Sequence, residues 1–258
     1  MIRVTEEKIT EYLGKIPFTF KIFDELESTN LYAKQSVGKE LNNHVIIADK
    51  QTAGRGRCGR DFYSPEGNGI YMSAVIKADK KFEDIELLTV AVAAITHKAI
   101  EKVSGCNCEI KWVNDIYLNK KKICGILCEN ILDKNSMKVK HIIIGIGINV
   151  KSTENFPREL QNKAGAIAIP SLDRNFLIAE ILKGIYNLSE NFELDDYLSY
   201  YREHSMVLNK MIRFNENGKE MFGRAVEINS SGNLVVELLN NEKRILRSGE
   251  ISIGVSDA

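Results

Sequence analysis

The chain of 258 residues has little proline, with only four residues, and it has no tract of low complexity. Together with a hydrophobic content of 44%, this composition is typical of an ordered globular protein rather than a disordered one. The chain also lacks a net charge, because 35 basic residues balance 35 acidic residues. A protein whose whole surface is built to hold DNA is therefore not expected, although local clusters of charge are compatible with this balance.

Long hydrophobic runs are missing as well. The apolar runs 87–95 and 142–150 are far shorter than the ~20 residues that cross a bilayer. The N-terminus is charged between Arg3 and Lys8, which does not resemble a signal peptide. We therefore expect a protein with no membrane partner.

Cysteine is too scarce and too irregular for a secretory framework, since the five residues are odd in number. A reducing cytoplasm is the simplest location. Four of the cysteines could be imagined as a zinc site, but the Cys-x-Cys spacing at 106–108 and the Cys-x3-Cys spacing at 124–128 are atypical of structural zinc sites. We expect no metal-binding residues.

Hydrophobic periodicity predicts an α+β fold with a sheet covered by helices on one face. The clearest helix spans 84–104, with Asp84 as its cap, Gly105 as its stop and His97 on its solvent face. Beyond Leu208, short strands separated by Asn, Ser and Gly predict a small all-β barrel of under fifty residues. Further strands are expected at 45–48, 69–76, 109–113, 115–118, 123–132 and 139–150, and further helices at 28–37, 173–189 and 195–203.

The segment KQTAGRGRCGR at 50–60 holds four cations and three glycines and no acid. Glycines let a backbone approach a ligand closely, and arginines with free N–H groups form a concave anion site. A solvated basic loop or a nucleic-acid contact is the alternative. The segment lies between two predicted strands, which favours binding of phosphate or carboxylate. It lacks the Gly-Lys-Ser/Thr ending of a Walker A loop.

Two further segments carry polar groups beside apolar strands. In 111–129, Trp112 is either a core anchor or an apolar wall for a ligand. Lys122 stands at the start of a buried strand, where its ammonium group can be held at a fixed point. In 142–150, Gly145 and Gly147 allow either close strand–helix packing or a flat bed for a planar ring, with Asn149 at its edge.

Five motifs in order resemble those of the biotin-protein ligases. They are Glu-Ser-Thr-Asn at 27–30, the GRGRCGR loop at 54–60, KWVND at 111–115, the Lys122-x-x-Gly125 strand and GIGIN at 145–149. The terminal RSGEIS at 247–252 resembles the end of the small C-terminal domain of that family. The resemblance implies a catalytic domain at 1–209 with a mixed sheet and helices on one face, followed by an SH3-like β domain at 210–258.

The reaction implied by the resemblance joins biotin to ATP as biotinyl-AMP and then transfers biotin to a lysine of a biotin carboxyl carrier domain. Mg²⁺ would arrive with the nucleotide. The implied catalytic residues are Lys122, Arg57 and Asp115, where Asp115 either orients Lys122 or receives a proton. The implied biotin-binding residues are Ser28, Thr29, Asn30, Gln51, Gly54, Arg55, Gly56, Arg57, Trp112, Lys122 and Gly125. The implied nucleotide-binding residues are Arg55, Arg57, Arg60, Trp112, Asn114, Lys122 and Asn149.

The sequence departs from the family at three positions. Val113 stands where proline is usual, Cys58 stands where some members carry arginine, and Gly254 replaces a further arginine near the C-terminus. The last change puts a contribution of the small domain to nucleotide binding in doubt.

Two rival functions stay open. A lipoate or octanoate ligase of the same superfamily would need a long apolar channel instead of the polar set around Ser28 and Gln51. A nucleic-acid-binding module using the Arg-Gly loop would bind in a salt-sensitive way without ATP. The Ser-Thr-Asn motif begins at residue 28, so we expect the form without a DNA-binding domain and no specific nucleic-acid partner. A homodimer is the default assembly.

Overall fold

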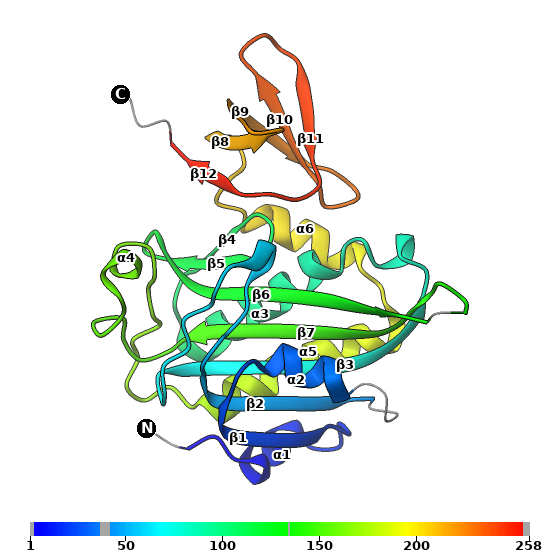
Figure 1. The fold of residues 1–258 in the computed structure, drawn as a ribbon, viewed down its shortest axis with the longest axis vertical. Helices are drawn as coiled ribbons and strands as arrows, with labels where there is room; N and C mark the ends of the chain where they lie inside the picture. The colour runs from blue at the N-terminus through cyan, green and yellow to red at the C-terminus, as the bar shows by residue number, and fades with distance from the viewer. Residues whose placement is uncertain (1–2, 37–41, 134, 255–258) are drawn as a thin grey trace.

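The computed structural model describes residues 3–36, 42–133 and 135–254, and its larger part is built on a seven-stranded mixed sheet (Figure 1). The strand order is β1-β2-β3-β7-β6-β5-β4, in which β1 and β2 are parallel and all other neighbours are antiparallel. The strands are β1 (Thr19–Leu26), β2 (His44–Gln51), β3 (Gly69–Lys80), β4 (Glu109–Lys111), β5 (Asp115–Leu118), β6 (Lys121–Leu132) and β7 (Val139–Asn149). The central strands β3 and β7 are buried over most of their length, as their nearly continuous apolar sequences require.

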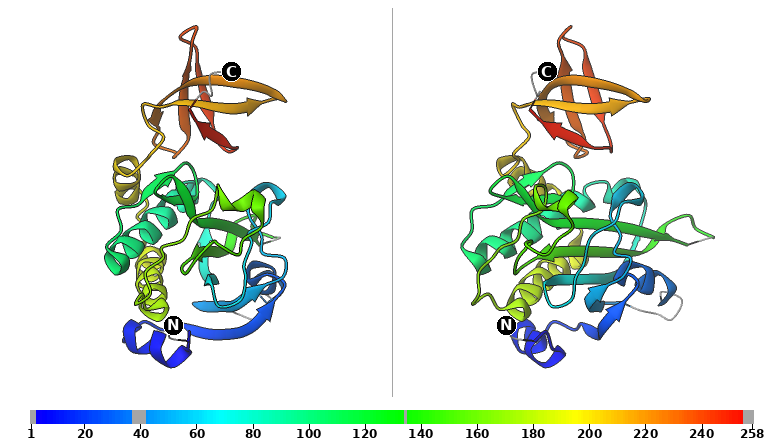
Figure 2. Two further views of the ribbon diagram at one scale, coloured as in Figure 1. Left: turned by 90° about the vertical axis from the view of Figure 1, so that its left-hand side faces the viewer. Right: turned by 60° about the vertical axis from the view of Figure 1, so that its left-hand side comes forward.

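Helices cover one face of this sheet, as the left view of Figure 2 shows. They are α1 (Glu6–Leu13), α3 (Leu88–Ser104), α5 (Arg174–Asn191) and α6 (Asp195–Glu203), with α5 packed between α1 and α3. The shorter α2 (Thr29–Ser36) packs on the other face against β2, β3 and β7, where Ala33 meets Ile46, Val75 and Ile143. The predicted α+β class is confirmed. No helix in the described part of the chain is long and apolar enough to span a bilayer.

The expectations for α3 need two corrections. The helix begins at Leu88, because Asp84 lies in a separate 3-10 turn and accepts a hydrogen bond from the Lys81 N–H instead of capping the helix. His97 is fully buried, so its expected position on the solvent face is wrong. The cause is α6, which packs against α3 and covers that face. A cover that comes from so far along the chain is invisible to local periodicity.

Other elements agree more closely. Helix α6 begins and ends at the expected residues, and the Asp173 side chain caps α5 by accepting from the Asn175 N–H at 2.9 Å. Helix α2 ends at Ser36, and residue 37, where the helix was expected to end, lies outside the described residues. Helix α1 and strand β1 were not expected. Every residue of β1 is exposed or half-buried, in keeping with its place at the sheet edge.

The C-terminal part is a five-stranded antiparallel sheet in the order β11-β10-β9-β8-β12 (Figure 2). Its tight turns occur at the expected Asn-Gly and Ser-Gly positions, with Gly218 and Gly232 at positive φ angles of 81° and 75°. Hydrogen bonds from Trp112 Nε1 to the Gly232 carbonyl and from Arg202 Nε to the Ile228 carbonyl help to tie it to the larger part. Its strands are β8 (Met211–Glu216), β9 (Lys219–Ile228), β10 (Leu234–Leu238), β11 (Lys243–Leu246) and β12 (Ile251–Ile253).

Candidate active site

A cavity of about 690 Å³ lies where the sheet, the loop after β2 and the C-terminal part meet. Its wall includes the start of α2, the loop 55–63, the β4–β5 hairpin, the glycine strands β6 and β7, the segment 156–164 and residues 249–252. This volume is typical of a small-molecule site. The segment 249–252 comes from the C-terminal part of the chain, so both parts contribute to the cavity.

One wall of the cavity is polar and almost fully buried. Ser28, Thr29 and Asn30 are each no more than 4% exposed, at the start of α2. The Thr29 N–H and hydroxyl both donate to Gln51 Oε1, at 2.9 and 3.2 Å, and Gln51 Nε2 donates to the Ser64 hydroxyl. Buried polar groups held this way present donors and acceptors at fixed positions.

A residue not expected from the sequence supports this wall. The Ser73 hydroxyl lies 2.7 Å from Thr29 Oγ1 and 2.5 Å from Asn30 Oδ1, and it is fully buried on β3. A Cβ atom at Gly145 would lie 2.2 Å from Asn30 Oδ1, so only glycine leaves room for the amide. Ser73 and Gly145 therefore fix Asn30 from two strands of the sheet.

The glycines of β7 serve packing within the protein. Gly145 admits the Asn30 side chain from α2, which is the close strand–helix packing offered as one reading of the motif. At Gly147, a Cβ atom would lie 2.5 Å from the ring of Phe62. The ring of Phe62 thus occupies the space above Gly147 in which the sequence suggested a planar ligand. Phe62 lines the cavity and was not expected from the sequence.

The loop 54–60 folds as a tight hairpin. Gly54 accepts from the Phe62 N–H, and the Gly56 N–H donates to the Arg60 carbonyl at 2.6 Å. Arg57 Nη1 donates to Asn114 Oδ1 at 3.1 Å, which ties the loop to the β4–β5 hairpin. Arg60 forms an ion pair with Glu250 of the C-terminal part. These contacts hold a cation-rich strap along the cavity.

Lys122 and Asp115 form an ion pair inside the cavity, with Nζ and Oδ1 2.7 Å apart. The backbone of Lys122 is fixed by two hydrogen bonds to the segment 163–165, at 2.9 and 2.8 Å. Gly125 leaves space for the lysine tip, because a Cβ atom there would lie 3.2 Å from Nζ. The ammonium group is held at a defined point, as its place at the start of the strand led us to expect.

A second lysine of the cavity was not among the expected site residues. Burial lowers the pKa of Lys111, and the nearby Lys122 and Arg60 lower it further, against the opposing effect of Asp115. Its Nζ lies 3.4 Å from the hydroxyl of Tyr117, whose pKa burial raises to about 12. Crowding of cations lowers a lysine pKa in this way, and a bound anion would relieve it. Lys111 belongs to the KWVND motif, but the motif does not reveal the cations that surround it. Only the structure shows that Lys122 and Arg60 lie nearby.

Trp112 and Asn149 also line the cavity. Trp112 is 4% exposed, so it is both a buried anchor and part of the cavity wall. Asn149 Nδ2 donates to the Gly165 carbonyl at 2.9 Å, whereas its buried Oδ1 has no hydrogen-bond partner. An unsatisfied buried acceptor in a cavity wall is a position where a ligand donor would be favoured.

The structure brings together nearly all the residues expected from the sequence. Only Gly54 lies outside the cavity wall, and there a Cβ atom would lie 2.4 Å from the Phe62 carbonyl, so it shapes the hairpin instead. The members in the wall are Ser28, Thr29, Asn30, Gln51, Arg55, Gly56, Arg57, Arg60, Trp112, Asn114, Asp115, Lys122, Gly125 and Asn149.

A mixed sheet that carries a partly buried, cation-lined cavity with a fixed lysine is the kind of site that suits anionic ligands. Comparison with known proteins makes this class specific. Residues 22–149 match the model of the biotin/lipoate A/B protein ligase family, and residues 207–254 match the biotin protein ligase C terminal domain.

Individual relatives agree with this match. The bifunctional ligase/repressor BirA of Bacillus subtilis is 33% identical over 242 residues, which cover 87% of this chain and 72% of the relative. The Escherichia coli BirA is 30% identical over 221 residues, or 82% and 67% of the two chains. The biotin protein ligase from Aquifex aeolicus, solved in complex with biotin and ATP, has a TM-score of 0.77 and 26% identity, covering 92% of this chain and 99% of that one. The chain belongs to the biotin/lipoate A/B protein ligase family, and it is a ligase.

Proposed function

We propose that this protein activates biotin as biotinyl-5′-AMP and transfers it to a lysine of a biotin carboxyl carrier domain. The observation that carries the proposal is the single cavity that joins the polar wall at Ser28–Asn30, the arginine strap and the Lys122–Asp115 pair. The Aquifex aeolicus ligase, solved with biotin and ATP, shares the fold at a TM-score of 0.77. The apolar chain of a lipoate-type substrate would offer no donors or acceptors to the polar wall.

The biotin site is assigned to the polar wall and its surroundings. The ureido ring carries both N–H donors and a carbonyl acceptor, which suits the fixed hydroxyl and amide groups of Ser28, Thr29, Asn30 and Gln51. Trp112 lines the apolar part of the pocket. Gly125 leaves room for the tip of Lys122, and Gly54 and Gly56 allow the close packing of the loop beside the pocket.

The nucleotide site is assigned to the arginine strap and the end of β7. Arg55, Arg57 and Arg60 surround the phosphates, and Asn114 holds Arg57 in place. The unpaired Oδ1 of Asn149 accepts from the amine of adenine.

Mg²⁺ fits this site as a companion of the nucleotide. Of the three cavity-lining carboxylates, Asp115 pairs with Lys122 and Glu250 pairs with Arg60, which leaves Asp61, and one carboxylate does not make a cage for the ion. The phosphates would hold the ion, as is usual for Mg²⁺. The ion would supply neutralisation of the pyrophosphate charge.

In the first step, a carboxylate oxygen of biotin bonds to the α-phosphorus of ATP. The bond to the bridging oxygen breaks, and pyrophosphate leaves with the electron pair. Lys122 and Arg57 stabilise the negative charge that is crowded between carboxylate and phosphate, an effect that is large in a site shielded from water. Asp115 keeps the Lys122 ammonium group in position.

In the second step, the neutral amine of the carrier lysine attacks the carbonyl carbon of biotinyl-AMP. An amide bond forms, the bond to the phosphate oxygen breaks, and AMP leaves. Lys122 stabilises the charge on the tetrahedral intermediate, and Asp115 receives the proton of the amine. The strap shields the anhydride from water until the carrier arrives.

The test is incubation with biotin, ATP, Mg²⁺ and a biotin carboxyl carrier domain, followed by intact mass measurement. We expect the carrier to gain the mass of one biotin, and a carrier whose acceptor lysine is replaced by arginine to gain none. Lipoate in place of biotin is the competing substrate. Addition of lipoate but not of biotin would overturn the proposal in favour of the lipoate ligases.

Three further expectations belong to the proposal. The chain divides into a catalytic domain at 1–209 and an SH3-like β domain at 210–258. It forms a homodimer, which size-exclusion chromatography with light scattering tests. It works in the cytoplasm without a nucleic-acid partner, and its five free cysteines support a reducing location.

A further inference from the structure

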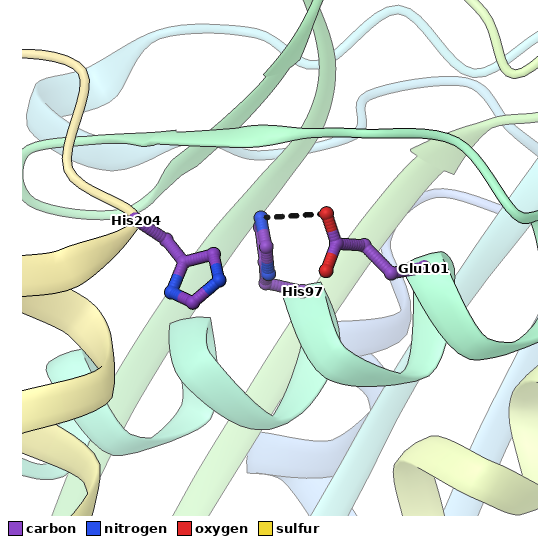
Figure 3. A group of neighbouring side chains, drawn as sticks. All are labelled: His97, Glu101 and His204. Atoms are coloured by element: carbon purple, nitrogen blue, oxygen red, sulfur yellow. Dashed lines mark ion pairs between the residues drawn. The ribbon is translucent and has the colours of Figure 1, made fainter.

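A group of potential metal ligands lies at the contact between α3 and the end of α6, apart from the cavity described above (Figure 3). His97 and Glu101 stand one turn apart on α3, and His204 ends α6. One ligand atom from each lies within 4.8 Å of the others. Two imidazoles and a carboxylate form a donor set that suits zinc.

The separations of the ligand atoms are somewhat longer than those of a formed zinc site. Two ligands of a tetrahedral zinc ion lie about 3.4 Å apart, because each bond is ~2.1 Å long. His97 Nε2 lies 3.7 Å from Glu101 Oε1 and 3.0 Å from the Cys108 carbonyl oxygen. The ligand atoms of the group lie within 4.8 Å of one another, so they would have to draw together by up to about 1.4 Å to reach this separation.

Hydrogen bonds hold each ligand from behind, as in established metal sites. His204 Nδ1 donates to the Tyr200 carbonyl at 2.9 Å, which leaves Nε2 with a free lone pair toward His97. The Cys108 N–H donates to Glu101 Oε1 at 3.0 Å and leaves the second carboxylate oxygen open. These contacts orient the ligands without occupying all of their lone pairs.

His97 is the ligand that has to change its hydrogen bonding. In this structure Nε2 donates to the Cys108 carbonyl, and Nδ1 accepts from the Tyr200 hydroxyl. With the proton moved to Nδ1, that nitrogen donates to the same hydroxyl and Nε2 becomes a ligand. Because the Nε2 lone pair then faces the Cys108 carbonyl oxygen at 3.0 Å, that oxygen has to turn aside to admit the ion.

We propose that His97, Glu101 and His204 bind a divalent zinc-like ion, with water in the remaining position. Glu101 and His204 are only half-buried, which gives the ion a route from solvent. The ion would fasten α3 to the end of α6. The same end of α6 is bonded to β4 through the Ile110 N–H and the His204 carbonyl at 2.8 Å, and the next residue along β4, Lys111, lines the cavity.

The test is calorimetric titration of the chelator-treated full chain with Zn²⁺. We expect one ion per chain, and at least about tenfold weaker binding in His204→Gln and in Glu101→Gln, since the loss of an outer partner alone costs that much. The matched control is His141→Gln, which removes a buried histidine on β7 and should leave binding unchanged. Circular dichroism establishes that each variant is folded.

A Co²⁺ titration of the same proteins identifies the ligand type. Nitrogen and oxygen ligands predict visible d–d bands without a thiolate charge-transfer band. A strong thiolate band would place the ion on cysteines such as Cys106 and overturn the proposal. So would the absence of binding up to millimolar Zn²⁺, or equal affinity in His204→Gln and His141→Gln.

Discussion

Replacement of Lys122 by alanine should nearly abolish formation of the adenylate while leaving the fold intact. The ammonium group is the positive charge fixed at the centre of the cavity, 2.7 Å from Asp115. Removal of one preorganised stabiliser of transition-state charge typically costs about 10²–10³ in rate, or about 2.7–4 kcal/mol. We expect a loss of at least this size, because the neighbouring Asp115 carboxylate would then repel the substrate anions.

The cost in stability should be much smaller. The side chains of Lys122 and Asp115 are 33% and 20% exposed, so solvent screens their attraction, and such pairs contribute about 1 kcal/mol or less. The assay is biotin-dependent exchange of labelled pyrophosphate into ATP, with thermal unfolding measured alongside. The matched control is Lys121→Ala, whose side chain is exposed and lies outside the cavity wall. Exchange by Lys122→Ala within about twofold of the unaltered protein would refute the assigned role.

Three other predictions test separate parts of the account. Arg57→Ala should raise the dissociation rate of biotinyl-AMP by about ten- to a hundredfold in stopped flow, as expected for the loss of a hydrogen bond to a charged group. An unaltered rate would show that Arg57 does not bind the intermediate. Gly145→Ala places a Cβ atom 2.2 Å from Asn30 Oδ1. It should therefore lower the free energy of unfolding by about 1–3 kcal/mol in a denaturant titration and weaken biotin binding. Unchanged binding would show that Asn30 is not a biotin ligand. Burial, with repulsion from Lys140 and Lys77, lowers the pKa of His141 below 6.5 in the folded protein. The unfolded chain therefore binds the proton more readily, and the free energy of unfolding should fall as the pH drops below about 6.5–7. His141→Gln should make this slope shallower, and an identical slope would contradict the assignment.

Much of the site followed from the sequence because its residues lie in compact motifs. The cations of the loop at 54–60 and the lysine at the start of β6 are local features, and the structure places them in one cavity. The supporting residues were harder to find. Ser73 reads as a plain strand residue, and its importance comes from α2, which crosses the sheet to bring Asn30 within 2.5 Å.

The fold shows the same division between local and distant causes. The helices expected at 173–189 and 195–203 are present as α5 and α6. The face of α3 that carries His97 was expected to be exposed. It is covered by α6, which follows more than ninety residues later and which local periodicity does not reveal. The ligand set of His97, Glu101 and His204 was missed for that reason, since no spacing within one segment contains it.

The central claim is that the cavity joins biotin to AMP, and the most direct measurement compares carboxylic acids in the pyrophosphate exchange assay with the unaltered protein. The account predicts exchange that depends on biotin and is absent with lipoate or octanoate alone. Exchange supported by lipoate or octanoate but not by biotin would contradict it.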